Sequence, residues 1–316
     1  MKLSLVIPCY NEELNVRPML QACVDTFASA VESYELIFVN DGSRDGTWKE
    51  LKALYAEAPC AMKVVNFSRN FGKEAAMYAG LQQASGEYIT IIDADLQQHP
   101  QVALDMLRML EADEELDCVA AYQESRKEGA FTAWCKRCFY RLINKACEID
   151  FHQGASDFRT FRRSVRDAIL QMQDYYRFSK GIFSWVGFHT AYIPYTVQER
   201  HAGQTSWSFG KLVKYAIEGI VSFTTFPLKI ATVTGAVTAA LSLIYMLVVV
   251  IQKLAFGIDL PGYPTIIVLI LLIGGLQMMM LGLAGEYIAR IYTQGKHRPI
   301  YIARDILSHE ENSDND

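Results

Sequence analysis

Short apolar runs alternate with stretches of helical periodicity along the first part of the chain. The runs LSLVIP, ELIFVN, MKVVNF, EYITIID and DCVAAY begin at residues 3, 35, 62, 87 and 117. Each has the length and the bounding polar residues of a strand, and a helix-compatible segment separates it from the next. This alternation predicts an α/β fold, in which helices cover both faces of a mostly parallel sheet.

Two long runs without charged residues, 230–251 and 263–285, lie in the last third of the chain. Each reaches the roughly 20 apolar residues that a bilayer-spanning helix needs. A buried hairpin in a soluble core is the alternative, but two such long runs so close together favour a pair of membrane helices. The two runs also help to explain the hydrophobic content of 51%, which is high for a wholly soluble protein.

Basic residues flank these two runs and predict their orientation. Lysine and arginine are retained on the cytoplasmic side of short loops, and here they precede the first run and follow the second: Lys211, Lys214, Lys229, Arg290, Lys296 and Arg298. Both termini are therefore expected in the cytoplasm, with the protein as a multi-pass component of the inner membrane. The opening MKLSLVIPCYNEE is too short an apolar stretch for a cleavable signal peptide and is expected to form the first strand.

The domain layout follows from these patterns. We expect a cytoplasmic catalytic domain over 1–208, an amphipathic juxtamembrane helix over 209–229, two transmembrane helices over 230–290 and a cytoplasmic tail over 291–316. A net charge of −5 argues against nucleic acid as a partner. Seven scattered cysteines indicate reduced thiols rather than a disulfide framework.

Polar side chains follow the predicted strands, where ligands of open α/β sheets bind. Asp93 and Asp95 come directly after the fourth strand, and two carboxylates at a strand end suit Mg²⁺ or Mn²⁺. Solvated turn residues are the alternative for such a pair. Asp41 in NDGSRDGT could accept a hydrogen bond from a base, and Asn11 and Glu12 could meet a ribose or base. Each also has an alternative role in a turn or helix cap.

Motifs along the whole chain resemble one family. These are VIPCYNEELNV, VNDGSRDGT, SRNFGKEAA, IIDADLQQHP, SDFRTFRR, RHAGQTSW, GEYIARIY and RPIYI. In order and spacing the chain resembles the family 2, GT-A-fold glycosyltransferases of the polyisoprenyl-phosphate type, which include dolichyl-phosphate mannose synthase and the bactoprenol glucosyltransferases. The resemblance implies a GT-A nucleotide-diphospho-sugar transferase domain followed by a two-helix transmembrane hairpin.

The resemblance also implies roles for particular residues. The nucleotide pocket would be lined by Pro8, Tyr10, Asn11, Glu12, Asp41 and Asp93, and the metal and diphosphate would be held by Asp93, Asp95 and Gln97. The lipid phosphate would bind Arg126 and Arg137 in a basic, aromatic segment, with Lys136 and Arg141 as further candidates. Where the family has an acid after Gln97, this chain has Gln98.

Three residues are expected in the chemistry itself: Asp95, Asp157 and Arg200. Arg200 and Thr205 match a loop that closes over the donor diphosphate in this family, although Ser206 replaces a lysine that is common there. Asp157 matches the aspartate of the DFR motif, near the reactive carbon of the sugar. The acceptor phosphate is already nucleophilic near neutral pH, so Asp157 is expected to orient the acceptor or to assist proton removal.

The expected reaction is metal-dependent, inverting transfer of a hexose from a nucleotide-diphosphate sugar to a polyisoprenyl phosphate. UDP-glucose is the favoured donor, because the tail and the SW-containing loop look like those of the bactoprenol glucosyltransferases. UDP-4-formamido-arabinose, UDP-N-acetylhexosamine and GDP-mannose stay open, as does a homo-oligomeric assembly. A non-catalytic lipid-binding or transport subunit is the alternative of another class, but neither apolar run carries a charge that would mark a path for a polar headgroup.

Overall fold

The computed structural model describes residues 1–123, 155–197, 224–256 and 262–308. The chain divides into two compact units, and each is described by itself. One unit holds the described residues up to 197 together with 299–308, and the other holds 224–256 and 262–298. The sites expected at Arg126, Arg137, Arg200 and Thr205 lie outside the described residues, as does most of the segment expected to form the juxtamembrane helix.

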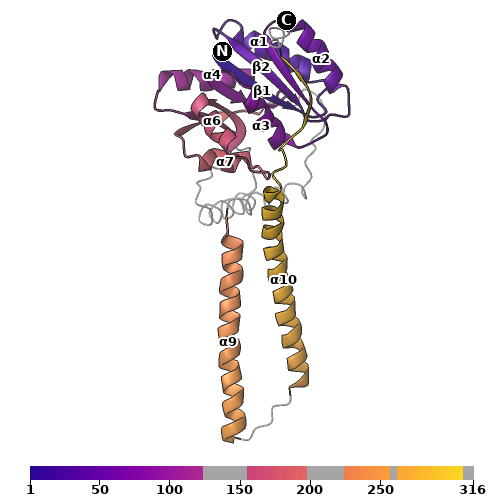
Figure 1. Ribbon diagram of the computed structural model, residues 1–316. Helices are drawn as coiled ribbons and strands as arrows, with labels where there is room; N and C mark the ends of the chain where they lie inside the picture. The colour runs from indigo at the N-terminus through magenta and orange to yellow at the C-terminus, as the bar shows by residue number, and fades with distance from the viewer. Residues whose placement is uncertain (124–154, 198–223, 257–261, 309–316) are drawn as a thin grey trace. The chain divides into compact units, whose positions relative to one another are not determined.

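The first unit is built on an eight-stranded sheet, which confirms the predicted α/β fold (Figure 1). The five predicted strands are β1 (Leu3–Cys9), β2 (Tyr34–Asn40), β3 (Ala61–Phe67), β4 (Tyr88–Ile91) and β5 (Cys118–Gln123). Three more strands join them, β6 (Ala155–Arg162), β7 (Thr190–Tyr195) and β8 (Ala303–Leu307). The order is β7-β5-β6-β4-β1-β2-β3-β8. Within it, β6 and β8 run antiparallel to their neighbours, and the remaining pairs are parallel.

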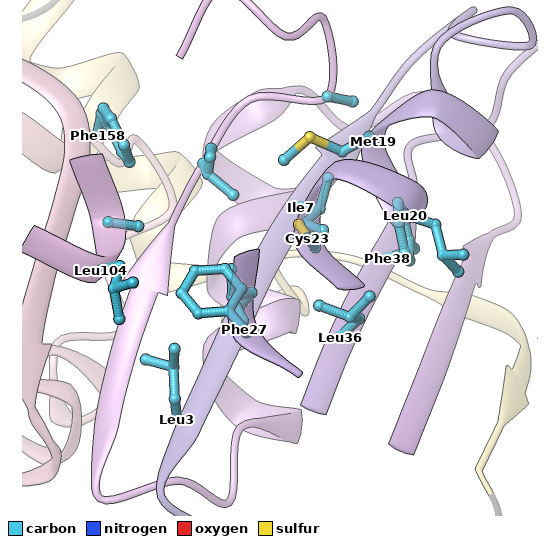
Figure 2. Close-up of a cluster of buried hydrophobic side chains, with 14 of the residues drawn as sticks. Leu3, Ile7, Met19, Leu20, Cys23, Phe27, Leu36, Phe38, Leu104 and Phe158 are labelled. Atoms are coloured by element: carbon cyan, nitrogen blue, oxygen red, sulfur yellow. The ribbon is translucent and has the colours of Figure 1, made fainter. Parts of the chain in front are cut away.

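One face of the sheet is covered by α1 (Val16–Phe27), α2 (Thr47–Glu57) and α4 (Pro100–Ala112). Alternate residues of β1 point into this layer, namely Leu3, Leu5 and Ile7. Figure 2 shows Met19, Cys23 and Phe27 of α1 gathered over β1 and β2. Fully burying a leucine or phenylalanine side chain stabilises a fold by roughly 1.5–3 kcal/mol, so this layer fixes the strands whose ends carry the site.

The other face is covered by α3 (Lys73–Gln83), α6 (Arg163–Gln171) and α7 (Ser179–Trp185). Gly80 lets α3 approach β1 closely, because a Cβ there would lie 2.2 Å from Cγ1 of Val6. On α7, Phe183 packs against Phe161 of β6, with ring centroids 5.1 Å apart. It also lies 4.0 Å from the guanidinium of Arg159, which allows this buried arginine to stay in the layer.

The second unit is a pair of long helices, α9 (Phe226–Phe256) and α10 (Tyr263–Gly295). By length and composition, the segments Phe226–Val249 and Leu269–Gly295 are each long and apolar enough to cross a membrane. Their most apolar stretches are not buried within the protein. The helices touch where a Cβ on Gly235 would lie 3.9 Å from Cε of Met280. Two exposed helices of this length and apolarity indicate association with a membrane.

The chain returns to the sheet after α10. Within the segment expected to be a tail, β8 pairs antiparallel with β3. Tyr301 stacks on Phe67 with centroids 4.8 Å apart, and Ser68 N donates to Ile302 O at 3.0 Å. The strand therefore closes an edge of the sheet that would otherwise expose unpaired backbone groups.

Candidate active site

The strand directions bring the predicted acidic site residues that the structure describes to one edge of the sheet. The carboxyl ends of β1, β2, β3 and β4 meet there because these strands are parallel. The neighbouring β6 is antiparallel, and Arg159 pairs with Ile91. The start of β6 therefore extends past the end of β4, which places Asp157 beside Asp93. This is the edge at which ligands of open α/β sheets bind.

A lysine joins these two carboxylates. Lys73 Nζ lies 2.6 Å from Asp93 Oδ1 and 3.4 Å from Asp157 Oδ2. Burial lowers the pKa of Lys73, but the charges of Asp93 and Asp157 outweigh it and raise that pKa above its usual value. The ammonium therefore stays charged. Lys73 lies in the SRNFGKEAA motif, but its place at the start of a helix does not distinguish it from a solvated surface lysine, so it was not predicted as a site residue.

Asp157 is held in its ionised form. Burial raises its pKa, but Lys73 first, and then Lys180 and Arg159, outweigh burial and hold the pKa below its usual value. The Asp157 side chain is 17% exposed. Its Oδ1 is buried and has no hydrogen-bond partner among the residues that the structure describes. A buried carboxylate oxygen without a partner is rare in folded proteins and marks Asp157 as a candidate functional residue.

Asp95 lies two residues beyond Asp93 in the sequence and is buried. Its Oδ1 accepts a hydrogen bond from Gln97 N at 3.1 Å. Between them, Leu96 adopts a left-handed backbone with φ 61°, a conformation that costs a non-glycine residue about 1 kcal/mol. Strained backbone of this kind clusters at functional sites, and here it falls inside the predicted metal motif.

Gln98 is a site residue that sequence analysis missed. Its Oε1 accepts from Asp93 N at 2.9 Å, and its Nε2 donates to Asp93 Oδ2 at 3.2 Å. An ionised acid cannot make both contacts, because a carboxylate only accepts. The departure from the family pattern at position 98 was a visible signal, and the structure gives it a physical meaning: Gln98 fixes the orientation of Asp93.

The donor set at this edge fits a hard divalent cation. Asp93, Asp95 and Gln97 offer oxygen ligands, which Mg²⁺ and Mn²⁺ prefer. Within the described ranges, no group of three His, Cys, Asp or Glu side chains is placed to hold a metal ion. Two carboxylates nevertheless suit an ion that completes its shell with water and diphosphate oxygens, which is the usual manner of binding for Mg²⁺.

Three of the residues expected to line a nucleotide pocket, Tyr10, Asn11 and Glu12, follow β1, and hydrogen bonds join two of them to residues that follow β2. Asn11 has φ 57°, and it is held by two bonds: Asn11 N donates to Ser43 Oγ at 2.9 Å, and Asn11 Oδ1 accepts from Arg44 N at 2.9 Å. Glu12 N donates to Thr47 Oγ1 at 2.9 Å. Pro8 lies within β1. The Tyr10 side chain is 40% exposed, so it is accessible to a ligand.

Asp41 lies at the same edge and binds the loop after β3. Asp41 Oδ1 accepts from Phe71 N at 2.6 Å, Asp41 Oδ2 accepts from Asn70 Nδ2 at 2.9 Å, and both oxygens accept from Gly72 N. Burial raises the pKa of Asp41 to about 6, although the backbone hydrogen bonds act to lower it. Asp41 therefore secures the loop that leads into Lys73. Contact with a base stays a prediction for this residue.

An α/β sheet with acidic residues at its carboxyl edge is the arrangement expected for a transferase of the GT-A type. Comparison with protein families gives the same result. Residues 4–170 match the model of glycosyl transferase family 2, and residues 226–291 match that of the GtrB C-terminal hairpin. The chain belongs to glycosyl transferase family 2, as its motifs predicted.

Relatives match over nearly the full length. The bactoprenol glucosyl transferase of Shigella phage SfV is 39% identical over 96% of this chain and 99% of its own. The prophage bactoprenol glucosyl transferase homolog of Escherichia coli K12 is 39% identical over 97% and 99%. An uncharacterized glycosyltransferase of Synechocystis sp. is 38% identical over 96% of this chain and 95% of its own.

Among solved structures, glucosyl-3-phosphoglycerate synthase of Mycobacterium tuberculosis aligns with 70% of this chain and 78% of its own, at 19% identity and a TM-score of 0.49. The family assignment rests on the sequence matches.

Proposed function

We propose that this protein transfers glucose from UDP-glucose to undecaprenyl phosphate or another polyisoprenyl phosphate, with inversion at the anomeric carbon. Two relatives that match over nearly the full length are named as a bactoprenol glucosyl transferase and a homolog of one. Family models match both the N-terminal domain and the C-terminal hairpin. The observation that carries the proposal is the meeting of Asp93 and Asp157 through Lys73 at the edge that also holds Asp95.

In this proposal Asp93, Asp95 and Gln97 hold Mg²⁺ or Mn²⁺ together with the donor diphosphate. When bound, the ion supplies Lewis-acid stabilisation of the negative charge that develops on the leaving diphosphate. Gln98 keeps Asp93 in the orientation that this role needs. Arg200, carried over from the family resemblance, adds a positive charge beside the diphosphate.

The acceptor needs no strong base. A phosphate monoester has a second pKa of about 6, so much of it is dianionic near neutral pH. One of its oxygens attacks the anomeric carbon while the bond from that carbon to the diphosphate oxygen breaks, and this single displacement inverts the centre. Because Lys73 holds the pKa of Asp157 low, Asp157 is a poor proton acceptor. Its proposed role is therefore to orient the acceptor.

The hairpin brings the catalytic domain to the bilayer in which the acceptor resides. The basic residues around the two apolar helices favour a cytoplasmic catalytic domain and a location in the inner membrane. Arg126 and Arg137 are proposed to bind the lipid phosphate, since arginine pairs with phosphate through two parallel hydrogen bonds.

The test uses the purified full-length chain in detergent with Mn²⁺ and undecaprenyl phosphate. Radiolabelled UDP-glucose, UDP-N-acetylhexosamine, UDP-4-formamido-arabinose and GDP-mannose are supplied one at a time, and the lipid is then extracted. Label from UDP-glucose should appear in the organic phase only when the lipid phosphate is present. Label from a different donor alone would overturn the choice of sugar, and no label from any donor would overturn the proposed reaction.

A further inference from the structure

A row of polar side chains crosses three neighbouring strands beneath the nucleotide loops. Asp305 of β8 pairs in register with Asn66 of β3, and Asn66 pairs with Asn40 of β2. Asn40 is 1% exposed and Asn66 is 5% exposed. Buried amides of this kind are costly unless each is bonded, so their partners hold them in one arrangement.

The hydrogen bonds along this row have one direction. Asn66 Nδ2 donates to Asp305 Oδ2 at 2.8 Å, and Asn40 Nδ2 donates to Asn66 Oδ1 at 2.8 Å. A carboxylate only accepts, so Asp305 selects the NH₂ side of the Asn66 amide. This leaves the Asn66 oxygen facing Asn40, which orients the second amide in the same sense. An acid at one end thereby determines how two buried amides are turned.

The row continues into the loops after β2 and β1. Asn40 Oδ1 accepts from Ser43 Oγ at 2.5 Å and from Ser43 N at 3.3 Å. The Ser43 hydroxyl, having donated its hydrogen to Asn40, accepts from Asn11 N at 2.9 Å. Asn11 has a left-handed backbone, a conformation that asparagine adopts when local hydrogen bonds hold it.

We propose that Asp305, on the strand that follows the hairpin, is a positioning residue for the nucleotide pocket. It acts through the amides of Asn66 and Asn40 on Ser43, and through Ser43 on Asn11. This inference rests on the proposed function, in which Asn11 lines the pocket for the donor nucleotide. It makes donor binding depend on a residue that lies beyond both apolar helices in the sequence (Figure 1, yellow).

The experiment measures UDP binding to the full-length protein in detergent by isothermal titration calorimetry. Asp305→Ala should weaken UDP binding about tenfold, the effect expected when a charge-assisted hydrogen bond that orders a site is lost. Asp305→Asn keeps an oxygen that can accept from Asn66, so it should bind within about threefold of the wild type. Arg304→Ala, at an exposed position of the same strand, is the matched control and should leave binding unchanged.

A double-mutant cycle separates positioning from general damage to the fold. If Asp305 acts through Ser43, Asp305→Ala should have little further effect on UDP affinity in a Ser43→Ala background. Additive losses would overturn the proposed route. The KM for lipid phosphate should stay the same in Asp305→Ala, whereas the KM for the nucleotide sugar should rise.

The outcomes distinguish this inference from the proposed function. A wild-type protein that binds neither UDP nor GDP would overturn both. A wild-type protein that binds UDP, with Asp305→Ala binding it equally well, would overturn the positioning role alone. Should Asp305→Ala fail to fold, Asn66→Ala interrupts the same row and leaves β8 intact, and it must then show the same loss of UDP affinity.

Discussion

The Lys73 ammonium lies 2.6 Å from Asp93 Oδ1 and reaches Asp157 Oδ2 at 3.4 Å. One cation therefore joins the exit of β4 to the start of β6. The Lys73 and Asp93 side chains are 40% and 30% exposed, so solvent screens the pair and its net attraction is about 1 kcal/mol. A divalent ion that binds Asp93 has to compete with this ammonium for the same carboxylate.

Replacing Lys73 with methionine should therefore strengthen metal binding in the absence of nucleotide. Methionine keeps much of the side-chain length and removes the charge, so the Mn²⁺ dissociation constant should fall by about tenfold. Electron paramagnetic resonance of free Mn²⁺ measures this without any turnover. Lys49→Met, at an exposed position of α2, is the control. Equal or weaker binding by Lys73→Met would show that Lys73 organises the carboxylates rather than competing for them.

Gln98 should tune the metal requirement through Asp93. Gln98→Leu removes both bonds to Asp93, and the Mn²⁺ concentration for half-maximal transfer should rise by about tenfold, as for residues that orient metal ligands. Gln98→Glu keeps the bond from Asp93 N but repels the Asp93 carboxylate. Its Mn²⁺ concentration for half-maximal transfer should therefore lie between those of the wild type and Gln98→Leu. Gln101→Ala, exposed on α4, should match the wild type. An unchanged metal requirement in Gln98→Leu would rule out the orienting role.

Hydrophobic patterning was enough to predict β1 to β5 and the edge at which Asp41, Asp93 and Asp95 lie. Those strands are buried, so their apolar runs stand out from the polar loops that follow. By contrast, β6 contains Asp157, Arg159 and Arg162 among eight residues, which hides its strand character. Arg159 is 4% exposed because Phe183 covers its guanidinium, and this is a contact between distant segments that no local pattern reveals.

The same reason explains why Lys73 and Asp305 were missed as functional residues. Lys73 begins a helix, where a single sequence indicates no more than a solvated side chain. Its partners come from strands separated from it by many residues. Asp305 belongs to a five-residue strand of mixed polarity, and only its register with Asn66 shows what it does. Pairings between segments far apart in sequence are set by tertiary structure.

The buried Asp41 should make stability depend on pH. Its pKa is raised by burial from an ordinary value of 3.8 to about 6, so the folded state holds the proton more tightly than the unfolded state. The resulting stabilisation is fully present below the unfolded pKa and is lost as the pH rises through 6, by about 3 kcal/mol at 1.36 kcal/mol per unit. Melting temperatures of the wild type and Asp41→Asn can be measured between about pH 4 and pH 7.5. As the pH rises, the melting temperature of the wild type should fall relative to that of Asp41→Asn. A difference independent of pH would contradict the raised pKa.

Arg137 tests the acceptor half of the proposal. Arg137→Ala should raise the KM for lipid phosphate by about tenfold or more, because a charged hydrogen bond to phosphate is lost. The KM for the nucleotide sugar should stay the same. Initial rates with each substrate varied in turn give both constants, and Arg108→Ala on the exposed side of α4 is the control. A rise confined to the donor KM would mean that the acceptor site is misplaced.

Asp95 gives the sharpest test of the metal role, because the chain contains a matched carboxylate. Asp95 Oδ1 accepts from the backbone N–H two residues on, at 3.1 Å, and exposed Asp113 makes the same local bond to Glu115 N at 3.0 Å.

Asparagine at either position keeps an accepting oxygen and removes the charge. Asp95→Asn should lower transfer of label to the lipid by at least about 100-fold, since the several kcal/mol that a bound ion supplies would be lost. Asp113→Asn should transfer normally. Both variants should appear in the membrane fraction and melt close to the wild type. Retention of most activity by Asp95→Asn would remove the metal from that position, because the variant keeps the accepting oxygen and loses only the charge.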